Sequence, residues 1–306
     1  LGWGKSASWD ELVQGRSGIR MISRFPTEGL RTMFGGAVAH PGQQPDSCPE
    51  LTFEMARFAA GEALGEAGLA EAKDFPGPLF VATPPAELEW PQRKLLNEHP
   101  GGEGLQGYDR LLAAARSGAF KSMFETFQFA SVAEHLARAL RPRGLPVSVS
   151  TACASGATAI QLGVEAIRRG ETTTALAIGT DSSLQLEALI RFSLLSALST
   201  RNDRPEAASR PFTKSRDGFV MAEGAAALVL ESLESAKARG ATCLGYVRGC
   251  GEMADDYHRT RSKPDGSAII GAIRNAILDA GVAPEEIDYV NAHGTSTPEN
   301  DKMEYL

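Results

Sequence analysis

The stretch VSVSTACASG, residues 147–156, decides both the fold and the chemistry that this chain suggests. Its first five residues alternate β-branched and serine side chains, a pattern typical of a strand. Apolar residues at helical spacing follow and end at Gly170, which predicts a helix over residues 154–169. Cys153 is therefore expected where a strand turns into a helix, beside the free backbone N–H groups of the helix N-terminus.

The surroundings of Cys153 favour a nucleophile, although an arbitrary cysteine is more often a buried structural residue. The positive potential at a helix N-terminus favours the thiolate, which is the reactive form of cysteine. Ala152, Ala154 and Gly156 add almost no bulk, so a substrate carbonyl can approach the sulfur. The same N–H groups could bind an oxyanion.

The remaining cysteines, Cys48, Cys243 and Cys250, keep the structural interpretation. No two of the four form a CxxC pair, which argues against a zinc site or a disulfide scaffold. A reducing cytoplasm is the simplest compartment for such a chain. We predict no metal and no redox cofactor.

Strands and helices are expected to alternate outward from this stretch, which favours an α/β fold. Further strands are expected at residues 79–82, 175–179, 225–230, 243–249 and 287–292. Further helices are expected at residues 8–13, 50–68, 127–141, 185–198, 232–239 and 267–280. Residues 84–125 are harder to interpret, because Pro-rich and Gly-rich pieces surround what read as short helices.

A second candidate position follows the expected strand at residues 287–292. Sites in α/β proteins lie at the carboxyl ends of such strands, and His293 stands there with Gly294 behind it. Thr295 and Thr297 could offer hydroxyls to an extended, amide-bearing ligand. A lone histidine at a strand end is more often structural, but a cysteine with a histidine is the usual arrangement of a thiol enzyme.

Two acidic residues follow at helical spacing. Asp301 and Glu304 lie one helical turn apart. We interpret them as capping groups or as partners in a salt bridge within the wall of the site, in preference to a direct catalytic role.

Composition excludes several classes of function. The chain has 306 residues, enough for one large or two ordinary domains, and its net charge of −7 argues against sequence-independent binding of nucleic acid. No apolar run reaches the ~18 residues of a membrane span, and no charged-then-apolar leader predicts secretion.

Taken together, these motifs resemble the elongating type I/II beta-ketoacyl-acyl-carrier-protein synthases, which are condensing enzymes of the thiolase fold. Residues 151–156 resemble their active-site motif, and residues 291–298 with Asp301 and Glu304 resemble their first histidine motif. Further matching segments are residues 15–20, 197–203, 209–212, 216–220 and 223–224. Several spaced motifs in the right order make the resemblance specific.

The resemblance implies a five-layer αβαβα sandwich of two similar halves and a homodimer. The first half would cover residues 1–239 and the second would begin at residue 240 and be incomplete. A second histidine, a lysine and a glycine-rich loop with a gating phenylalanine would lie beyond Leu306, and a first strand before Leu1. We therefore expect a chain that lacks the extreme N-terminus and about the C-terminal quarter of the family, and that is inactive alone.

The resemblance also implies an acyltransferase reaction, the decarboxylative Claisen condensation of fatty-acid chain elongation. Cys153 would carry the acyl chain and His293 would stabilise an enolate formed from malonyl-acyl carrier protein. Thr295 and Thr297 would hold the pantetheine arm. By analogy Phe192 lies beside the acyl pocket, Phe219 near the active site and His258 near the pantetheine entrance. For these last three, core packing or a surface position is an equally good interpretation.

Acyl carrier protein is the partner that the resemblance implies. Because both proteins are acidic, docking would need a local basic patch, for which the candidates are Arg57, Arg191, Arg201, Arg259 and Arg261. A ketosynthase of a type II polyketide pathway and a non-catalytic partner subunit are the alternatives, and a thiol hydrolase is a weaker one. Residues 82–130 depart from the family pattern, which leaves the acyl chain length open.

Overall fold

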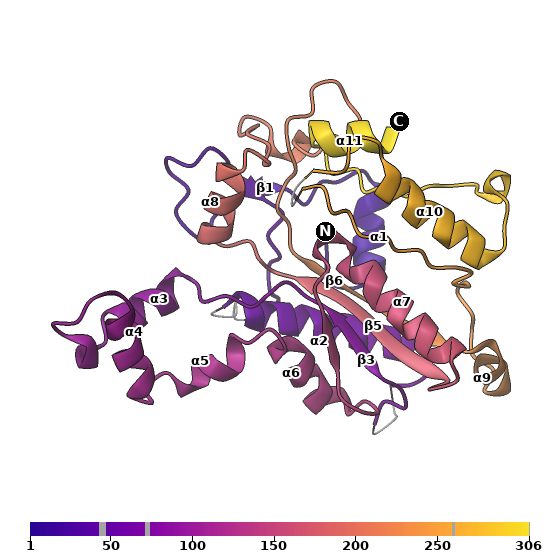
Figure 1. Cartoon of the computed structure of the whole chain (residues 1–306), viewed down its shortest axis with the longest axis horizontal. Coiled ribbons are helices and arrows are strands. Elements are labelled where there is room, and N and C mark those ends of the chain that lie inside the picture. The colour runs from indigo at the N-terminus through magenta and orange to yellow at the C-terminus, as the bar shows by residue number, and fades with distance from the viewer. Residues whose placement is uncertain (43–46, 71–73, 259–260, 306) are drawn as a thin grey trace.

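A four-stranded sheet forms the centre of the protein in the computed structural model, which describes residues 1–42, 47–70, 74–258 and 261–305 (Figure 1). The strands β3 (Leu79–Ala82), β4 (Val147–Val149), β5 (Thr174–Asp181) and β6 (Gly224–Glu231) lie in the order β4-β3-β5-β6. The strands β4, β3 and β5 run parallel, and β6 pairs with β5 antiparallel. The carboxyl ends of the three parallel strands therefore meet at one edge.

Helices cover both faces of this sheet, because its two central strands are apolar on both sides. Leu79, Val81, Leu176 and Ile178 face α2 (Cys48–Glu66) and α6 (Ser131–Leu140). The alternate residues Phe80, Ala82, Ala175 and Ala177 face α7 (Ser155–Arg168). Burial of each large apolar side chain contributes about 1.5–3 kcal/mol, so these two layers hold the sheet rigidly behind the site.

The helix α10 (Ser267–Ala280) lies beside α7 and extends the molecule beyond the first three layers (Figure 1). Arg168 on α7 reaches Asp279 on α10 at 2.7 Å. The extended segment before α10 passes so close to it that a Cβ on Gly251 would stand 2.1 Å from the carbonyl oxygen of Ala272. Only glycine permits that approach.

The expectation of strands at residues 243–249 and 287–292 is wrong. Neither segment forms a ladder with another strand among the residues that the structure describes. Their large side chains stand in solvent, with Leu244 81% and Tyr289 80% exposed. Apolar alternation predicts a strand, but a strand also needs a neighbouring backbone for its hydrogen bonds, and none pairs with these segments.

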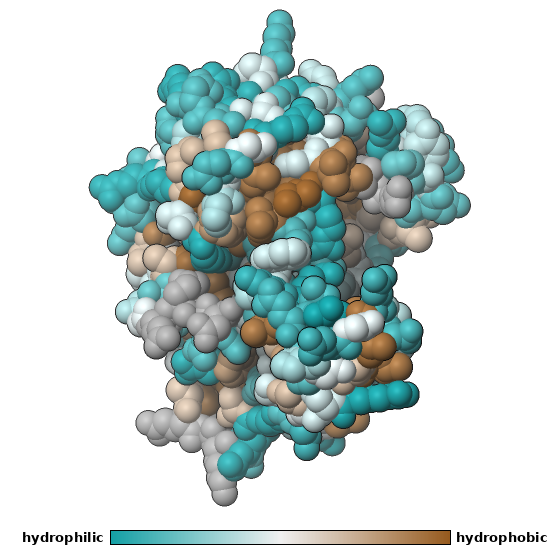
Figure 2. All heavy atoms as spheres, turned by 90° about the vertical axis from the view of Figure 1, so that its left-hand side faces the viewer, coloured by the Kyte–Doolittle hydropathy of each residue, from teal (hydrophilic) through white to brown (hydrophobic). Residues whose placement is uncertain are grey.

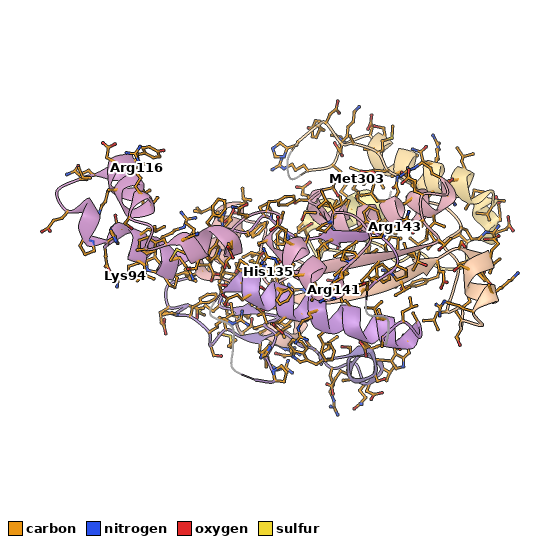
Figure 3. The ribbon with its side chains drawn as sticks, turned by 90° about the horizontal axis from the view of Figure 1, so that it is seen from below. Lys94, Arg116, His135, Arg141, Arg143 and Met303 are labelled. Carbon is orange, nitrogen blue, oxygen red and sulfur yellow. The ribbon has the colours of Figure 1, made fainter. Side chains whose placement is uncertain are left out.

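The other sequence-predicted elements are present with small shifts in their ends. Residues 84–125 fold into an arm that projects from the body (Figures 1 and 3), and Lys94 and Arg116 mark its outer part. Its helices are α3 (Trp90–Asn97), η1 (Pro100–Gly102), α4 (Gly107–Arg116) and α5 (Lys121–Thr126). His135, by contrast, lies on α6 in the body, where its Nδ1 is 2.7 Å from the carbonyl oxygen of Ser131.

The remaining elements are short and lie around the sheet. They are α1 (Lys5–Val13), β1 (Arg20–Met21), β2 (Phe34–Gly35), α8 (Leu186–Leu194), η3 (Pro205–Ala207), α9 (Leu233–Ala238), η4 (Pro284–Glu286) and α11 (Pro298–Tyr305). Figure 2 views the end that carries the arm and shows hydrophobic side chains gathered above its centre. Within the described ranges, no helix has the length and apolar character needed to cross a membrane.

Candidate active site

Cys153 lies on a tight turn between β4 and α7. The turn is the 3-10 segment η2 (Ala152–Ala154), and it places the sulfur in an exposed position. Ala152 is left-handed there, with φ of 51°, a backbone conformation that costs an L-residue about 1–2 kcal/mol. The hydroxyl of Ser155 holds this turn, because it accepts the N–H of Thr151 at 2.8 Å and donates to the carbonyl of Ala152 at 2.6 Å.

The fold brings the imidazole of His293 close to the thiol of Cys153, although the two residues are 140 positions apart. Hydrogen bonding to this imidazole lowers the pKa of Cys153 more than burial raises it. The same bond raises the pKa of His293 against the effect of burial, and the nearby charges of Glu304 and Asp301 add to the rise. The two shifts together favour a thiolate paired with an imidazolium, which is the reactive state of a thiol enzyme.

Glu304 holds the backbone that carries His293. Its two carboxylate oxygens accept the N–H of His293 at 2.6 Å and the N–H of Gly294 at 2.8 Å. The side-chain amide of Asn300 donates to Glu304 at 2.8 Å as well. Hydrogen bonds to a charged acceptor are among the stronger ones in proteins, so Glu304 fixes the position of the backbone at His293 and Gly294.

Asp301 ties the histidine loop to a second segment. Its carboxylate is only 1% exposed and accepts the N–H of Phe212 at 2.7 Å and that of Ser296 at 3.1 Å. Phe212 and Ser296 are both left-handed, with φ of 63° and 69°. The guanidinium of Arg216 lies 3.4 Å from Asp301 and balances its charge.

Thr295 and Thr297 lie side by side on the histidine loop, with their hydroxyl oxygens 2.8 Å apart. The hydroxyl of Thr297 also accepts the N–H of Asn300 at 3.3 Å, at the start of α11. His258, in contrast, is exposed on the segment between Gly251 and α10. The pantetheine roles of all three residues remain predictions.

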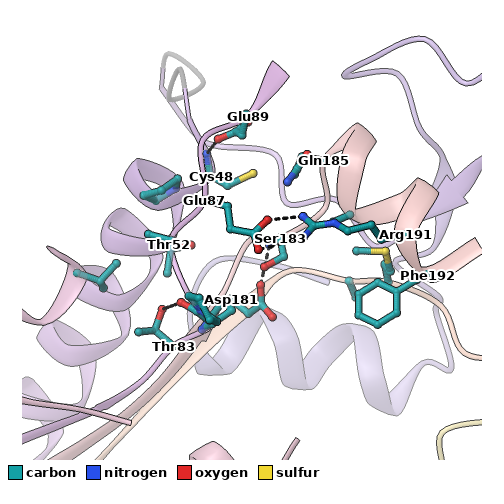
Figure 4. A pocket seen from close by; sticks show the side chains of 18 of the residues that line it. Cys48, Thr52, Thr83, Glu87, Glu89, Asp181, Ser183, Gln185, Arg191 and Phe192 are labelled. Carbon is teal, nitrogen blue, oxygen red and sulfur yellow. Dashed lines mark hydrogen bonds and ion pairs between the residues drawn. The ribbon is translucent and has the colours of Figure 1, made fainter. Parts of the chain in front are cut away.

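A pocket of about 510 Å³ opens at the carboxyl ends of β3 and β5 (Figure 4). Phe192 and Phe219 both line it and pack edge to face, with their ring centroids 5.3 Å apart. The structure therefore brings together Phe192, which the resemblance puts beside the acyl pocket, and Phe219, which it puts near the active site; their roles stay predictions.

Charged residues line the same pocket: Glu87 and Glu89, which the sequence interpretation missed, and Arg191, which it had proposed for carrier docking. Glu87 and Arg191 form an ion pair, with Nη1 of Arg191 3.0 Å from Oε1 of Glu87. Glu89 accepts the N–H of Cys48 at 2.6 Å, and burial raises the pKa of the Cys48 thiol. The only signal in the sequence was the departure from the family pattern that begins at residue 82.

The arginines proposed for carrier docking are partly engaged within the chain. Arg191 is the pocket residue just described, and Arg57 pairs with Glu54 at 2.9 Å. Arg259 lies outside the described residues. Within the part of the chain that the structure describes, no group of His, Cys, Asp and Glu could hold a metal ion.

Known proteins resemble this chain along almost its whole length. Residues 99–236 match the family "Beta-ketoacyl synthase, N-terminal domain" and residues 244–306 match "Beta-ketoacyl synthase, C-terminal domain". A 3-oxoacyl-[acyl-carrier-protein] synthase 2 of Coxiella burnetii is 32% identical, over 99% of this chain and 72% of that protein. A putative polyketide beta-ketoacyl synthase 1 of Streptomyces cyaneus is 34% identical, over 99% of this chain and 72% of that protein.

Solved structures agree with these relatives. A beta-ketoacyl synthase from Burkholderia phymatum has a TM-score of 0.76 at 32% identity, covering 97% of this chain and 72% of that one. A type II polyketide ketosynthase in complex with its acyl-carrier protein has a TM-score of 0.82 at 30% identity, covering 99% and 72%. They confirm the expected thiolase-like fold class, whereas the division at residue 239 stays a prediction. By its sequence matches and its fold, this chain belongs to the beta-ketoacyl synthase family.

Proposed function

We propose that this protein condenses an acyl group held on Cys153 with malonyl-acyl carrier protein, giving 3-oxoacyl-acyl carrier protein in fatty-acid chain elongation. The observation that carries the proposal is the exposed Cys153 turn at the carboxyl edge of the sheet, with the imidazole of the Glu304-held His293 loop close enough to the thiol to shift its pKa. It is supported by relatives named 3-oxoacyl-[acyl-carrier-protein] synthase 2 at 32–34% identity over nearly the whole chain.

In the first step, the Cys153 thiolate attacks the carbonyl carbon of an acyl thioester on the carrier protein. The turn at Ala152–Ala154 leaves the sulfur exposed and lined by small residues, so the carbonyl can reach it. The backbone N–H of Cys153 can stabilise the resulting oxyanion. The carrier thiolate then leaves, and an acyl-enzyme remains.

In the second step, malonyl-acyl carrier protein loses carbon dioxide and becomes an enolate. The imidazole of His293, whose pKa is raised, can donate a hydrogen bond to the enolate oxygen. The enolate carbon attacks the acyl-enzyme, a carbon–carbon bond forms, and the Cys153 thiolate is released. Thr295 and Thr297, adjacent on the same loop, would bind the amides of the pantetheine arm.

The partners follow from the reaction. Acyl carrier protein delivers both substrates, as the ketosynthase complex among the similar structures illustrates for that protein. A homodimer remains a prediction from the family resemblance. A cytoplasmic location also remains a prediction, supported by four cysteines that are all free thiols.

The test is acylation of Cys153 in the full-length protein by acyl-acyl carrier protein or by cerulenin, read by intact mass, followed by detection of the 3-oxoacyl product. The variant Cys153→Ala should take up no label, while Cys243→Ala, which removes another exposed thiol, should be labelled like the native chain. Acylation elsewhere, or none, would refute the proposal and leave a non-catalytic partner subunit. Release of free fatty acid in an assay that contains no malonyl donor would indicate a hydrolase.

A second candidate is the ketosynthase of a type II polyketide pathway. The polyketide relatives of Streptomyces cyaneus and Streptomyces glaucescens are 34% and 33% identical to this chain, as similar as the fatty-acid relatives. Substrate profiling distinguishes the two functions, because fatty-acid elongation requires reduced acyl primers and polyketide extension requires primers that keep their ketones. Faster turnover of ketone-bearing primers would favour the second candidate.

A further inference from the structure

Backbone hydrogen bonds connect the lining of the pocket beside Phe192 to the segments that carry Cys153 and His293. Thr83 lines the pocket just after β3 and donates its N–H to Val149 at 3.1 Å, on the strand that leads to Cys153. Phe219 lines it on another side, and the N–H of the preceding Gly218 donates to the carbonyl of Ser296 at 3.1 Å, on the histidine loop. An acyl chain held on Cys153 therefore has this pocket beside it.

The pocket has an apolar wall and a charged one. The apolar wall consists of Val132, Ala188, Phe192, Leu195, Phe219 and Met221. Beside Phe192, Glu87 and Arg191 point toward one another, with Cys48 and Glu89 further along (Figure 4). A plain alkyl chain would match only the first of these walls.

Carboxylates outnumber cations among the charged residues of the pocket. Its carboxylates are Glu87, Glu89 and Asp181, against the single guanidinium of Arg191. That guanidinium already reaches both oxygens of Glu87, which lowers the pKa of Glu87 and keeps it ionised. Asp181 accepts only the N–H of Ser183, at 2.6 Å, among the hydrogen bonds of the described residues.

From this arrangement we infer that the pocket selects acyl chains whose far end carries a hydrogen-bond donor, a hydroxyl or an ammonium group. The inference rests on the proposed function and deepens it by naming the substrate class. An alkyl chain that fills the pocket takes water away from the carboxylates and returns no hydrogen bond. A donor at the chain end restores that bond, whereas an anionic end repels the same carboxylates.

The test compares acyl thioesters in matched sets of equal chain length, ending in methyl, hydroxyl, amine or carboxylate. The readout is the rate of Cys153 acylation by intact mass. For chains long enough to reach the charged wall, we expect a hydroxyl or amine end to react about tenfold faster than methyl, the size of one net hydrogen bond. The carboxylate end should be slowest. Equal rates, or a methyl or carboxylate preference, would overturn the inference.

A double variant tests whether the preference for donor-ended acyl chains comes from the charged residues of the pocket. In Glu87→Leu/Arg191→Leu the ion pair is replaced by apolar side chains. The acylation rate with methyl-ended chains should then rise relative to the rate with hydroxyl-ended chains. The control Glu54→Ala/Arg57→Ala removes another ion pair, on α2 and outside the pocket, and should keep the native preference. An unchanged preference in the first variant would contradict the inference.

The outcomes separate this inference from the proposed function. If Cys153 is acylated by methyl-ended chains with no preference for a donor, the condensing function stands and the substrate class is refuted. If no thioester acylates Cys153, the proposed function fails, and the inference falls with it. The comparison among thioesters uses the native chain, so it does not depend on the stability of any variant.

Discussion

The two segments that meet at the candidate site are strained in the same way but held by different means. The Cys153 turn has one left-handed alanine, Ala152, and the histidine loop has a left-handed serine, Ser296. A serine hydroxyl near the surface holds the first, whereas the buried carboxylate of Asp301 holds the second together with Phe212.

The difference matches what each segment must do. A nucleophile has to be reached by a substrate, so its turn is exposed and is stabilised by neutral hydrogen bonds of about 1 kcal/mol each. Under the proposed function the histidine must keep one position relative to the sulfur, and its loop is stabilised by charge-assisted bonds to Glu304 and to the buried Asp301. The comparison predicts that the histidine loop tolerates substitution far less than the cysteine turn.

The largest effect is expected for Asp301→Ala. The change leaves Arg216 without its buried partner and frees two left-handed residues, so the free energy of unfolding should fall by about 3–5 kcal/mol. Chemical denaturation measures it. The control Glu299→Ala, an exposed carboxylate on the same helix, should change stability by less than about 0.5 kcal/mol. Equal losses in both variants would contradict the special role of Asp301.

The second-largest effect is expected for His293→Ala. Without the imidazole, decarboxylation of malonyl-acyl carrier protein should fall by about 10²–10³-fold, the usual cost of removing one oxyanion donor. The Cys153 thiol should also lose the hydrogen bond that lowers its pKa.

The pH dependence of Cys153 alkylation in this variant tests whether His293 lowers the pKa of the thiol or only supports the structure. Because the native pKa of Cys153 is lowered, its alkylation by iodoacetamide should rise with pH in a lower range than in His293→Ala. His135→Ala, a histidine on α6, should keep the native profile. Coincident profiles for the native chain and His293→Ala would disprove the thiolate–imidazolium pair.

The smallest effect is expected for Ser155→Ala. It removes two hydrogen bonds from the cysteine turn, one to the N–H of Thr151 and one to the carbonyl of Ala152, and should destabilise the protein by about 2 kcal/mol. Thermal unfolding measures this, with Ser150→Ala, another serine near the turn, as the control. A loss as large as that of Asp301→Ala would remove the contrast between the two segments.

The sequence predicted elements well where the apolar pattern and its packing partners lie in the same region. The strand at residues 79–82 and the helix at residues 267–280 appear with the predicted ends. Both segments have a clear boundary signal in the sequence. The strand begins directly after Pro78, and the helix ends at Gly281, which adopts the left-handed C-cap conformation. Local propensity and tertiary packing agree at these positions.

Prediction failed where a strand needed a partner that local sequence does not reveal. Residues 243–249 and 287–292 have strand-like patterns, yet their side chains are exposed and their backbones unpaired among the described residues. The ion pair in the pocket was also beyond prediction, because Glu87 and Arg191 are 104 positions apart and meet only through folding. A charged residue in a divergent segment carries no local sign of its distant partner.

The sequence by itself was enough to predict Cys153 as the nucleophile, since the strand, the small neighbours and the helix start around it are all local features. Family motifs added His293 and its acidic supports. Only the tertiary structure decided that His293 bonds Cys153, that Asp301 clamps two strained residues, and that the pocket has a charged wall. Hydrogen bonds and ion pairs depend on distances between segments far apart in the chain, and only packing around the sheet sets those distances.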